Sequence, residues 1–286
     1  MESADTLMSI EFTKMHGLGN DYHFIDAARF DIQDPPALSR AMSHRHLGVG
    51  SDGIILIQPS DSAEFAMRIF NADGSEAETC GNGLRCFAKY VFERGMTDKT
   101  DFVIDTLAGP NRVELRLDGS GKVATVRSNM GTPRFDRAEI PMEGPAGRVI
   151  REPIKVNGTT MEVTCANVGN PHAVFFVEDA TAVDLAHWGP LVENHPKFPK
   201  RTNVEFVTVQ DRQNIVMRIW ERGSGITMAS GSGSCGAALA SMITEQVERR
   251  VTVHLVYGSL TIEWAEDGHV YQEGPATEVF TGLWES

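Results

Sequence analysis

Two short glycine-containing segments carry the residue types best suited to acid–base chemistry. The first reads CGNG at 80–83 and the second reads SGSG at 230–233. Each precedes a run with helical spacing, so each places a thiol or a hydroxyl at a predicted helix N-terminus. Free N–H groups at such a terminus attract anions, and they lower the pKa of a cysteine thiol. Cys80 is therefore predicted to act as a base or a nucleophile near neutral pH.

The two glycine segments do not have the pattern of a nucleotide site. Neither reads G-x-G-x-x-G after an apolar strand with an acidic residue about 20 positions further on, and the chain contains no G-x-x-x-x-G-K-[ST]. The same helix-terminal geometry holds a carboxylate, which is the better candidate ligand.

Polar side chains in short apolar or glycine-rich contexts would complete such a site. An asparagine in one of these contexts is by itself typical of a turn. Taken together, the set fits an amino acid with a polar distal end. Its members are Asn20 in HGLGND, Asn71 in FNADGSE, Asn170 and His172 in GNPH, and Glu221 and Arg222 in WERG.

Four cysteines are too few for a disulfide framework in 286 residues. Cys80 and Cys86 are separated by five residues, and no nearby pair of histidines completes a zinc pattern. We predict that Cys86, Cys165 and Cys235 are small buried side chains.

Three helices are predicted around these segments. Apolar residues follow i, i+3, i+4, i+7 spacing at 84, 87, 88 and 91, and Gly95 stands where a C-terminal cap belongs. The same spacing recurs at 235, 238, 239 and 242 after Ser230, and a weaker helix is predicted over 36–46.

Most of the remaining chain has strand character. Strands are predicted over 215–220, 251–257 and 260–264 from their β-branched and aromatic residues, and Asp-Gly pairs at 118–119 and 267–268 predict hairpin turns. The two glycine segments lie about half the chain apart. This indicates two similar α/β halves, each with a helix opened by a glycine loop.

Composition limits the kinds of partner. The chain is 41% hydrophobic and 23% charged, which is ordinary for a globular protein, and its formal charge is −13. The acidic balance argues against nucleic acid or an anionic membrane as partner. The first residues show no basic and apolar signal pattern, and the longest uncharged stretch, 223–244, is too polar for a membrane span. A cytoplasmic protein of roughly two domains is expected.

Six sequence blocks carry a resemblance to a known family. They are KMHGLGNDY (14–22), FNADGSEAETCGNGLRC (70–86), TLAG (106–109), VGNPH (168–172), RTNVEF (201–206) and WERGSG (220–225). On these blocks the chain resembles the diaminopimelate epimerases of lysine and peptidoglycan biosynthesis. The resemblance implies two pseudo-symmetric domains, each a curled mixed sheet wrapped on a central helix. We expect one at 9–128 plus 275–286 and the other at 129–274, with the active site in the cleft between them.

The resemblance also implies a mechanism without metal or pyridoxal phosphate. Two cysteines on opposite faces of the substrate α-carbon remove and return its proton. Of these, Cys80 is present, with His172 and Glu221 assisting proton movement. The implied grip on the α-carboxylate comes from the backbone of Gly81, Asn82, Gly231 and Ser232. The implied grip on the distal end comes from Asn71, Asn170, Asn203 and Arg222, with further contacts from Asn20 and Glu221.

The chain departs from the family pattern at three positions. Ser230 stands where the pattern has its second catalytic cysteine, Ile226 replaces a usual glutamate, and Gly53 stands where some members carry a substrate-contacting glutamine. A hydroxyl is a far weaker acid than a thiol, so impaired epimerisation is expected. Ser230 is either an engineered knockout or a natural divergence, and Ile226 favours divergence because a knockout does not need it.

Three functions therefore remain in view. The first is a diaminopimelate epimerase, native or impaired at Ser230. The second is a one-base lyase or an epimerase of another amino acid, and the third is a non-catalytic amino-acid-binding paralogue. A small-molecule amino acid, diaminopimelate in the first case, is the expected partner, and a homodimer is one expected assembly.

Overall fold

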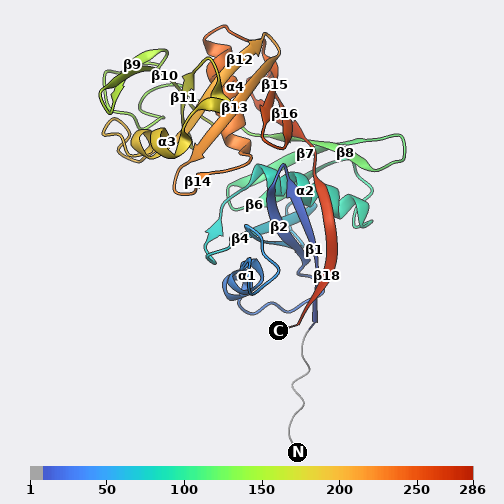
Figure 1. Ribbon diagram of the computed structural model, residues 1–286. Helices are drawn as coiled ribbons and strands as arrows, with labels where there is room; N and C mark the ends of the chain where they lie inside the picture. The colour runs from blue at the N-terminus through green and yellow to red at the C-terminus, as the bar shows by residue number, and fades with distance from the viewer. Residues whose placement is uncertain (1–8, 286) are drawn as a thin grey trace, which may run out of the picture. The chain divides into compact units, whose positions relative to one another are not determined.

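The computed structural model describes residues 9–285 and divides the chain into two compact units. The first unit runs to Val126 and resumes at Pro275, and the second unit is Arg127–Gly274. The first unit is thus built from both ends of the chain. Figure 1 shows this as the last strand, in red, lying beside the first strand, in blue.

The first unit contains two helices and a set of mostly antiparallel strands. Its elements are β1 (Ser9–Gly17), β2 (Asn20–Asp26), α1 (Pro35–Ser43), β3 (Gly53–Gln58), β4 (Phe65–Asn71), β5 (Glu76–Ala77), α2 (Gly81–Glu93), β6 (Asp101–Thr106), β7 (Gly109–Leu117) and β18 (Thr277–Glu285). The strand β8 (Val123–Asn129) continues from it into the second unit.

The second unit has a similar set of helices and strands. Its elements are β9 (Glu152–Val156), β10 (Thr159–Asn167), β11 (Pro171–Phe176), the 3₁₀ turn η1 (Ala180–Ala182), α3 (Leu185–Glu193), β12 (Asn203–Asp211), β13 (Asn214–Glu221), β14 (Gly225–Ile226), α4 (Gly231–Ile243), β15 (Arg250–Leu255), β16 (Gly258–Trp264) and β17 (Val270–Gly274).

The strand pairings of the two units repeat one another. In the first unit β1–β2 is antiparallel, β2–β3 parallel, β3–β4 antiparallel, β4–β6 parallel and β6–β7 antiparallel. In the second unit the same sequence of directions runs through β10, β11, β12, β13, β15 and β16. Each parallel pair is joined through a helix, as parallel strands require. The expected α/β fold of two similar halves is confirmed.

The helix α2 forms because its sequence supplies both a cap and an apolar face. The Cys80 side chain accepts a hydrogen bond from the Gly83 N–H at the first turn. Leu84, Phe87 and Val91 are buried against the strands of the first unit. Gly95 follows the helix with φ +67°, the left-handed conformation expected of a glycine that ends a helix.

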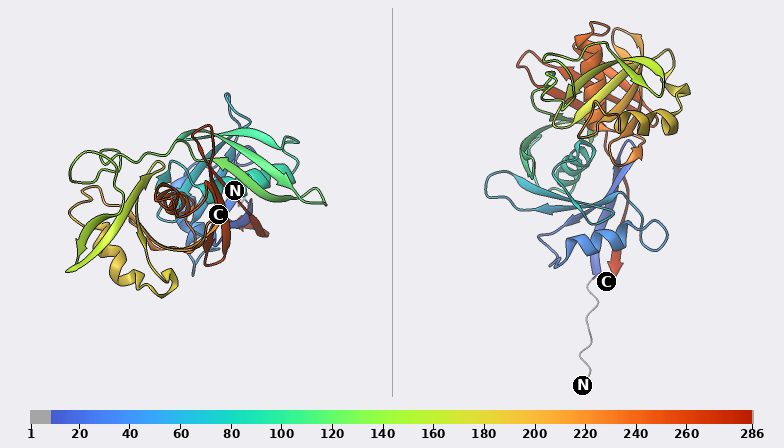
Figure 2. Two further views of the ribbon diagram at one scale, coloured as in Figure 1. Left: turned by 90° about the horizontal axis from the view of Figure 1, so that it is seen from above. Right: turned by 90° about the vertical axis from the view of Figure 1, so that its left-hand side faces the viewer.

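The helix α4 is instead built from small residues and is buried almost throughout. It packs against strands from β10 to β17, and the right-hand view of Figure 2 shows it in orange running through the second unit. Gly236 lets the helix approach closely, because a Cβ there would lie 2.6 Å from Cγ of His172. Small side chains are needed on this helix because strands contact it on several sides.

Two predicted elements extended too far toward the C-terminus. The weak helix expected over 36–46 ends at Ser43, since His44 takes an extended conformation with ψ 114°. The strand expected over 251–257 ends at Leu255, which pairs with Gly258. Val256 and Tyr257 form the hairpin turn between them and are exposed, despite their strand propensity.

Candidate active site

In the first unit, Cys80 lies at the N-cap of α2, as its sequence context predicts. Its backbone is extended, and its Sγ is 3.4 Å from the Gly83 N–H that donates to it. The first N–H groups of the helix, at Gly81 and Asn82, have no carbonyl four residues earlier within the helix to accept their hydrogen bonds. These donors, together with the helix dipole, form a local site for a carboxylate.

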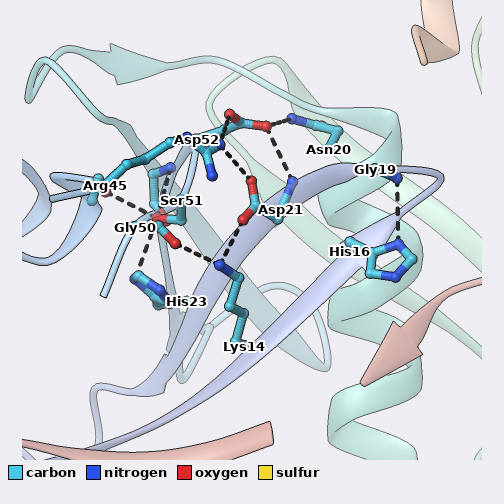
Figure 3. Close-up of polar contacts among 12 residues, drawn as sticks. Lys14, His16, Gly19, Asn20, Asp21, His23, Arg45, Gly50, Ser51 and Asp52 are labelled. Carbon is cyan, nitrogen blue, oxygen red and sulfur yellow. Dashed lines mark hydrogen bonds and ion pairs between the residues drawn. The ribbon is translucent and has the colours of Figure 1, made fainter. Parts of the chain in front are cut away.

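Asn20 connects this helix terminus to a charged cluster. Its Oδ1 accepts from Cys80 Sγ at 3.4 Å and from Asn82 Nδ2 at 3.3 Å. Its Nδ2 donates to Asp52 Oδ2 at 2.7 Å. Figure 3 shows Asn20 and Asp52 beside Arg45, whose guanidinium donates to Asp52 at 2.9 Å. Asn20 therefore contacts both Cys80 and a carboxylate.

Two other expected contact residues lie at strand ends in this unit. Asn71 ends β4, and its Nδ2 donates to Ser75 Oγ at 3.0 Å. Gly53 begins β3, where a Cβ would lie 2.1 Å from the Phe70 carbonyl oxygen. The close β3–β4 approach therefore excludes any side chain at 53 unless the backbone moves, so Gly53 can offer only backbone atoms.

In the second unit, Ser230 occupies the equivalent N-cap of α4. Its Oγ accepts from the Gly233 N–H at 3.1 Å, and its backbone is extended like that of Cys80. Gly231 lies beneath Gln272, whose Nε2 donates to the Gly231 carbonyl at 2.8 Å. Ser230 is 5% exposed, so its hydroxyl is largely removed from water.

A chain of polar groups leads from this helix terminus into the buried interior of the second unit. Asn170 Nδ2 donates to Ser232 Oγ at 3.2 Å, and Asn170 Oδ1 is 2.9 Å from His172 Nε2. The other ring nitrogen, Nδ1, is 2.6 Å from Glu205 Oε1. Burial raises the pKa of Glu205, with His172 opposing the shift. His172 is therefore oriented by a buried carboxyl group.

The turn after β13 carries the remaining expected residues. Asn203 fixes this turn through two backbone contacts: its Oδ1 accepts from the Arg222 N–H at 2.9 Å, and its Nδ2 donates to the Pro171 carbonyl at 2.8 Å. Glu221 is the last residue of β13 and is half-buried. The Arg222 side chain is exposed, with one contact at 3.3 Å to the Lys200 carbonyl.

Three residues that build these sites were not singled out from the sequence. Glu193 accepts from Trp220 Nε1 at 2.6 Å and from the Gly223 N–H at 2.9 Å, which anchors the turn after β13. Glu205 and Asp52 are the others. A carboxylate inside the apolar run NVEFV is a usable signal for Glu205, whereas nothing local marks Glu193.

The family model for diaminopimelate epimerase matches residues 12–135 and 164–279. The chain belongs to the diaminopimelate epimerase family. It is 52% identical over 275 residues to the diaminopimelate epimerase of Moorella thermoacetica, covering 96% of this chain and 98% of that protein. It is 48% identical over 274 residues to that of Methanococcus maripaludis, covering 96% and 99%.

Solved structures share the fold at much lower identity. A phenazine biosynthesis protein of the PhzF family from Bacillus anthracis has a TM-score of 0.69 at 14% identity, covering 97% of this chain and 99% of that one. A hydroxyproline epimerase from Agrobacterium vitis has a TM-score of 0.66 at 15% identity, covering 96% and 91%. The diaminopimelate epimerase-like fold is thus shared with proteins that carry other names.

The structure of this diaminopimelate epimerase family member also shows the surroundings of the three other cysteines and of Ile226. Cys86, Cys165 and Cys235 are buried. Burial raises the pKa of Cys86 to about 12, and burial also raises the pKa of Cys165. Ile226 lies on β14 with 56% of its side chain exposed, so the core does not require an apolar residue there. No helix within residues 9–285 has the length and apolar character to cross a membrane.

Proposed function

We propose that this chain, an isomerase of the diaminopimelate epimerase family, interconverts LL- and meso-diaminopimelate in lysine biosynthesis. One observation carries the proposal. Two topologically equivalent helices, α2 and α4, each begin at a residue with a titratable or hydroxyl group whose heteroatom accepts the N–H three residues on. We infer that both termini act on one substrate, Cys80 from one face of the α-carbon and Ser230 from the other.

On the first face, the Cys80 thiolate accepts the α-proton, which leaves an electron pair that spreads into the α-carboxylate. The free N–H groups of the first turn of each helix, at Gly81, Asn82, Gly231 and Ser232, hold that carboxylate and stabilise the developing charge. Placing these donors before the reaction begins is what lowers the barrier, since no reorganisation is then needed.

On the second face, Ser230 supplies the proton that completes inversion. Its Oγ accepts from Gly233, so its hydroxyl hydrogen remains able to donate. Donation leaves an alkoxide, which is a much stronger base than a thiolate, so this step is slow. We propose that activity is at least about two orders of magnitude below that of a two-thiol site, the scale of lost acid–base catalysis. His172 and Glu221 assist proton movement at the two faces.

The distal end of the substrate is held by the turn after β13 and by asparagines of both units. The exposed Arg222 guanidinium suits a bidentate contact to the distal carboxylate. Asn71, Asn170 and Asn203 add amide contacts, with Asn20 and Glu221 completing the set. Gly53 contributes backbone atoms only.

Incubation with each stereoisomer in deuterated water tests this function. Chiral separation follows epimerisation, and mass spectrometry follows exchange of the α-hydrogen. We expect exchange confined largely to the isomer whose α-hydrogen faces Cys80, with slow epimerisation. Full epimerase turnover by the serine-containing chain would refute the proposed impairment, and absence of both exchange and binding would refute the substrate.

A second candidate, a one-base lyase or epimerase of another amino acid, is favoured by Ile226. Its exposed apolar side chain lies four residues before Ser230, where the family pattern has a glutamate. A non-catalytic amino-acid-binding paralogue would retain the carboxylate-binding termini alone. Screening amino acids for α-hydrogen exchange and for binding separates the three, since the last binds without exchange.

We further propose a homodimer in the cytoplasm, the compartment expected of this family. Exposed apolar side chains on β18, namely Val279, Phe280 and Leu283, support self-association. Their strand is paired with β1 along one side, and apolar strands of this kind are usually covered.

A further inference from the structure

Asn20 lies in a chain of hydrogen bonds that runs from a cation to an anion. Arg85 Nη2 donates to Asn82 Oδ1 at 2.7 Å, and Asn82 Nδ2 donates to Asn20 Oδ1 at 3.3 Å. Asn20 Nδ2 then donates to Asp52 Oδ2 at 2.7 Å. Arg85 is fully buried, and Asp52 is half-buried.

The charged ends dictate which way each amide points. A guanidinium can only donate, so Asn82 must turn its oxygen to Arg85 and its NH₂ to Asn20. A carboxylate can only accept, so Asn20 must turn its NH₂ to Asp52. Reversing either amide would set two acceptors or two donors against each other. The direction therefore follows from charge rather than from the assignment of amide atoms.

Asp52 is itself firmly held. Arg45 donates to its Oδ1 at 2.9 Å, and the Asp21 N–H donates to its Oδ2 at 3.1 Å. Arg45 also reaches Asp21 at 3.0 Å, and Lys14 reaches Asp21 at 2.9 Å. Figure 3 shows this cluster around Asp52, with Asn20 on one side and Arg45 on the other.

The fixed direction places a carbonyl oxygen against the reactive cysteine. Asn20 Oδ1 is 3.4 Å from Cys80 Sγ, where it can accept from a thiol and repel a thiolate. The Gly83 N–H, also 3.4 Å from Sγ, acts in the opposite sense. We propose that Asp52 and Arg85 are positioning residues that lock the Asn20 amide with its oxygen toward Cys80, and so keep the thiol form accessible.

This inference rests on the proposed function and deepens it. A group that takes a proton from one isomer must return it to the other, so both its forms must be accessible near the working pH. A helix N-terminus alone biases a cysteine toward thiolate. The Asn20 oxygen balances that bias on the Cys80 side.

Within residues 9–285, the equivalent asparagine of the second unit makes no direct hydrogen bond to a carboxylate. Asn170 contacts the Ser232 hydroxyl and the His172 ring, and it reaches the buried Glu205 carboxyl group only through that ring. The Ser230 hydroxyl stays protonated without such a contact, because a hydroxyl is a far weaker acid than a thiol. The charged lock is therefore found in the unit that carries the cysteine.

Other titratable groups near Cys80 do not replace this control. Tyr22 on β2 is hydrogen-bonded to both Cys80 and Asn20, and burial raises its pKa well above its usual value, with the Cys80 charge adding to the shift. It therefore stays neutral across the working range. Other titratable groups close in sequence or on packed elements are the exposed Glu78, His16 on β1 and the buried Cys86 on α2.

Alkylation of the full chain tests the proposal without requiring turnover. Iodoacetamide reacts with thiolate, so its rate from about pH 5 to pH 10 reports the thiol–thiolate balance. Mass spectrometry of the Cys80 peptide separates this signal from the three buried cysteines. Because no substrate is involved, failure of the epimerase proposal leaves this result unaffected.

In Asp52→Asn the Asn20 amide loses the carboxylate that fixes its NH₂, so that only the Asn82 contact opposes a turn of the NH₂ toward the sulfur. We expect the midpoint of the alkylation profile to fall by roughly half a unit or more, a gain of about threefold in rate below the midpoint. Asp21→Asn is the matched control, because it removes the same charge from the same cluster without touching Asn20. It should shift the midpoint much less. Asp52→Ser provides the same test should the asparagine variant fail to fold.

The Asn20→Leu background decides whether the effect passes through Asn20. This variant loses the acceptor, so its own midpoint should fall. Adding Asp52→Asn to it should then produce little further change. An unchanged midpoint in folded Asp52→Asn, an equal shift in Asp21→Asn, or an undiminished shift in the Asn20→Leu background would each overturn the proposal.

Discussion

At the residue scale, the main difference between the two helix N-termini is that one carries the Cys80 thiol and the other the Ser230 hydroxyl. Both side chains accept the N–H three residues on, both sit on extended backbone, and both begin thirteen-residue helices. The two helix starts thus provide similar electrostatic settings for groups of very different acidity. In the proposed mechanism, the chemistry at the two faces differs because the sulfur and the oxygen differ, and the Asp52–Asn20 contact adds a difference on the Cys80 side.

Ser230→Cys should therefore raise epimerase activity by about two orders of magnitude or more. The thiol would replace a hydroxyl at an N-cap that already has the geometry of the Cys80 site. Chiral chromatography of the reaction with LL-diaminopimelate measures the gain. Ser230→Ala is the control, since it removes the proton donor and should abolish the residual epimerisation. A folded cysteine variant that binds substrate but remains inactive would favour the one-base alternative.

Arg222→Leu should weaken diaminopimelate binding by about 2 kcal/mol or more, because a charged hydrogen bond to the distal carboxylate is lost. Isothermal titration calorimetry with the full chain measures this. Arg212→Leu is the matched control, because it removes an exposed arginine from the opposite end of the same β12–β13 hairpin. Equal affinity for wild type and Arg222→Leu would point to a different substrate.

Much of the site could be proposed from sequence because its members sit in short, distinctive contexts. Cys80 could be placed at a helix terminus from glycine spacing and apolar periodicity alone. Asp52 could not, because its importance depends on Asn20, 32 residues away in the chain. The run NVEFV marks Glu205 but does not reveal its partner His172, which is 33 residues away. Local pattern contains no information about such partners.

At the element scale, long periodic segments were predicted well and short ones poorly. The spacing located α2 and α4, and the Asp-Gly pairs located the β7–β8 and β16–β17 hairpins. The two-residue strands β5 and β14 have no period to detect. They form because the chain folds back on β4 and β13 before each helix.

The strand β2 contains a histidine that should make stability depend on pH. Burial, with help from the Lys14 charge, lowers the pKa of His23 to about 4, against an ordinary value of 6.5. The unfolded chain therefore takes up this proton first as the pH falls. Stability due to the neutral ring is complete above about pH 6.5 and is lost progressively toward pH 4, by up to about 3 kcal/mol.

His23→Gln should accordingly flatten this pH dependence, because glutamine is neutral throughout and can still bond Ser51, which lies 3.3 Å from the ring. Urea unfolding at about pH 7 and pH 4.5 measures the difference in free energy for each protein. His46→Gln, at an exposed position, should behave as wild type. Parallel curves for wild type and His23→Gln would contradict the argument.

At the scale of the whole molecule, an exposed apolar strand is the feature most open to test. Leu283 on β18 is 68% exposed, so a charge there should leave the fold intact while opposing association. Leu283→Glu should convert the proposed dimer to a monomer, measured by light scattering after size-exclusion chromatography. Lys99→Glu, at another exposed site on the first unit, is the control. A monomeric wild type would remove the dimer from the proposal.

The repeat of the two halves was visible in sequence only at the two glycine segments, yet the structure extends it to every strand direction from β1 to β7. Fold is conserved in such a repeat by packing, and many sequences satisfy the same packing. Two of the matching positions that differ, Cys80 against Ser230 and Gly53 against Asn203, belong to the proposed site.

The pairing of β1 with β18 also has a consequence for biosynthesis. The ribosome makes β1 well before its partner β18, so the first unit lacks one strand until β18 has emerged. The second unit is continuous in the chain and can finish folding earlier, although its synthesis starts later. Until β18 has been made, the nascent chain must keep the edge of β1 that pairs with it, which includes Ile10 and Phe12, from pairing wrongly.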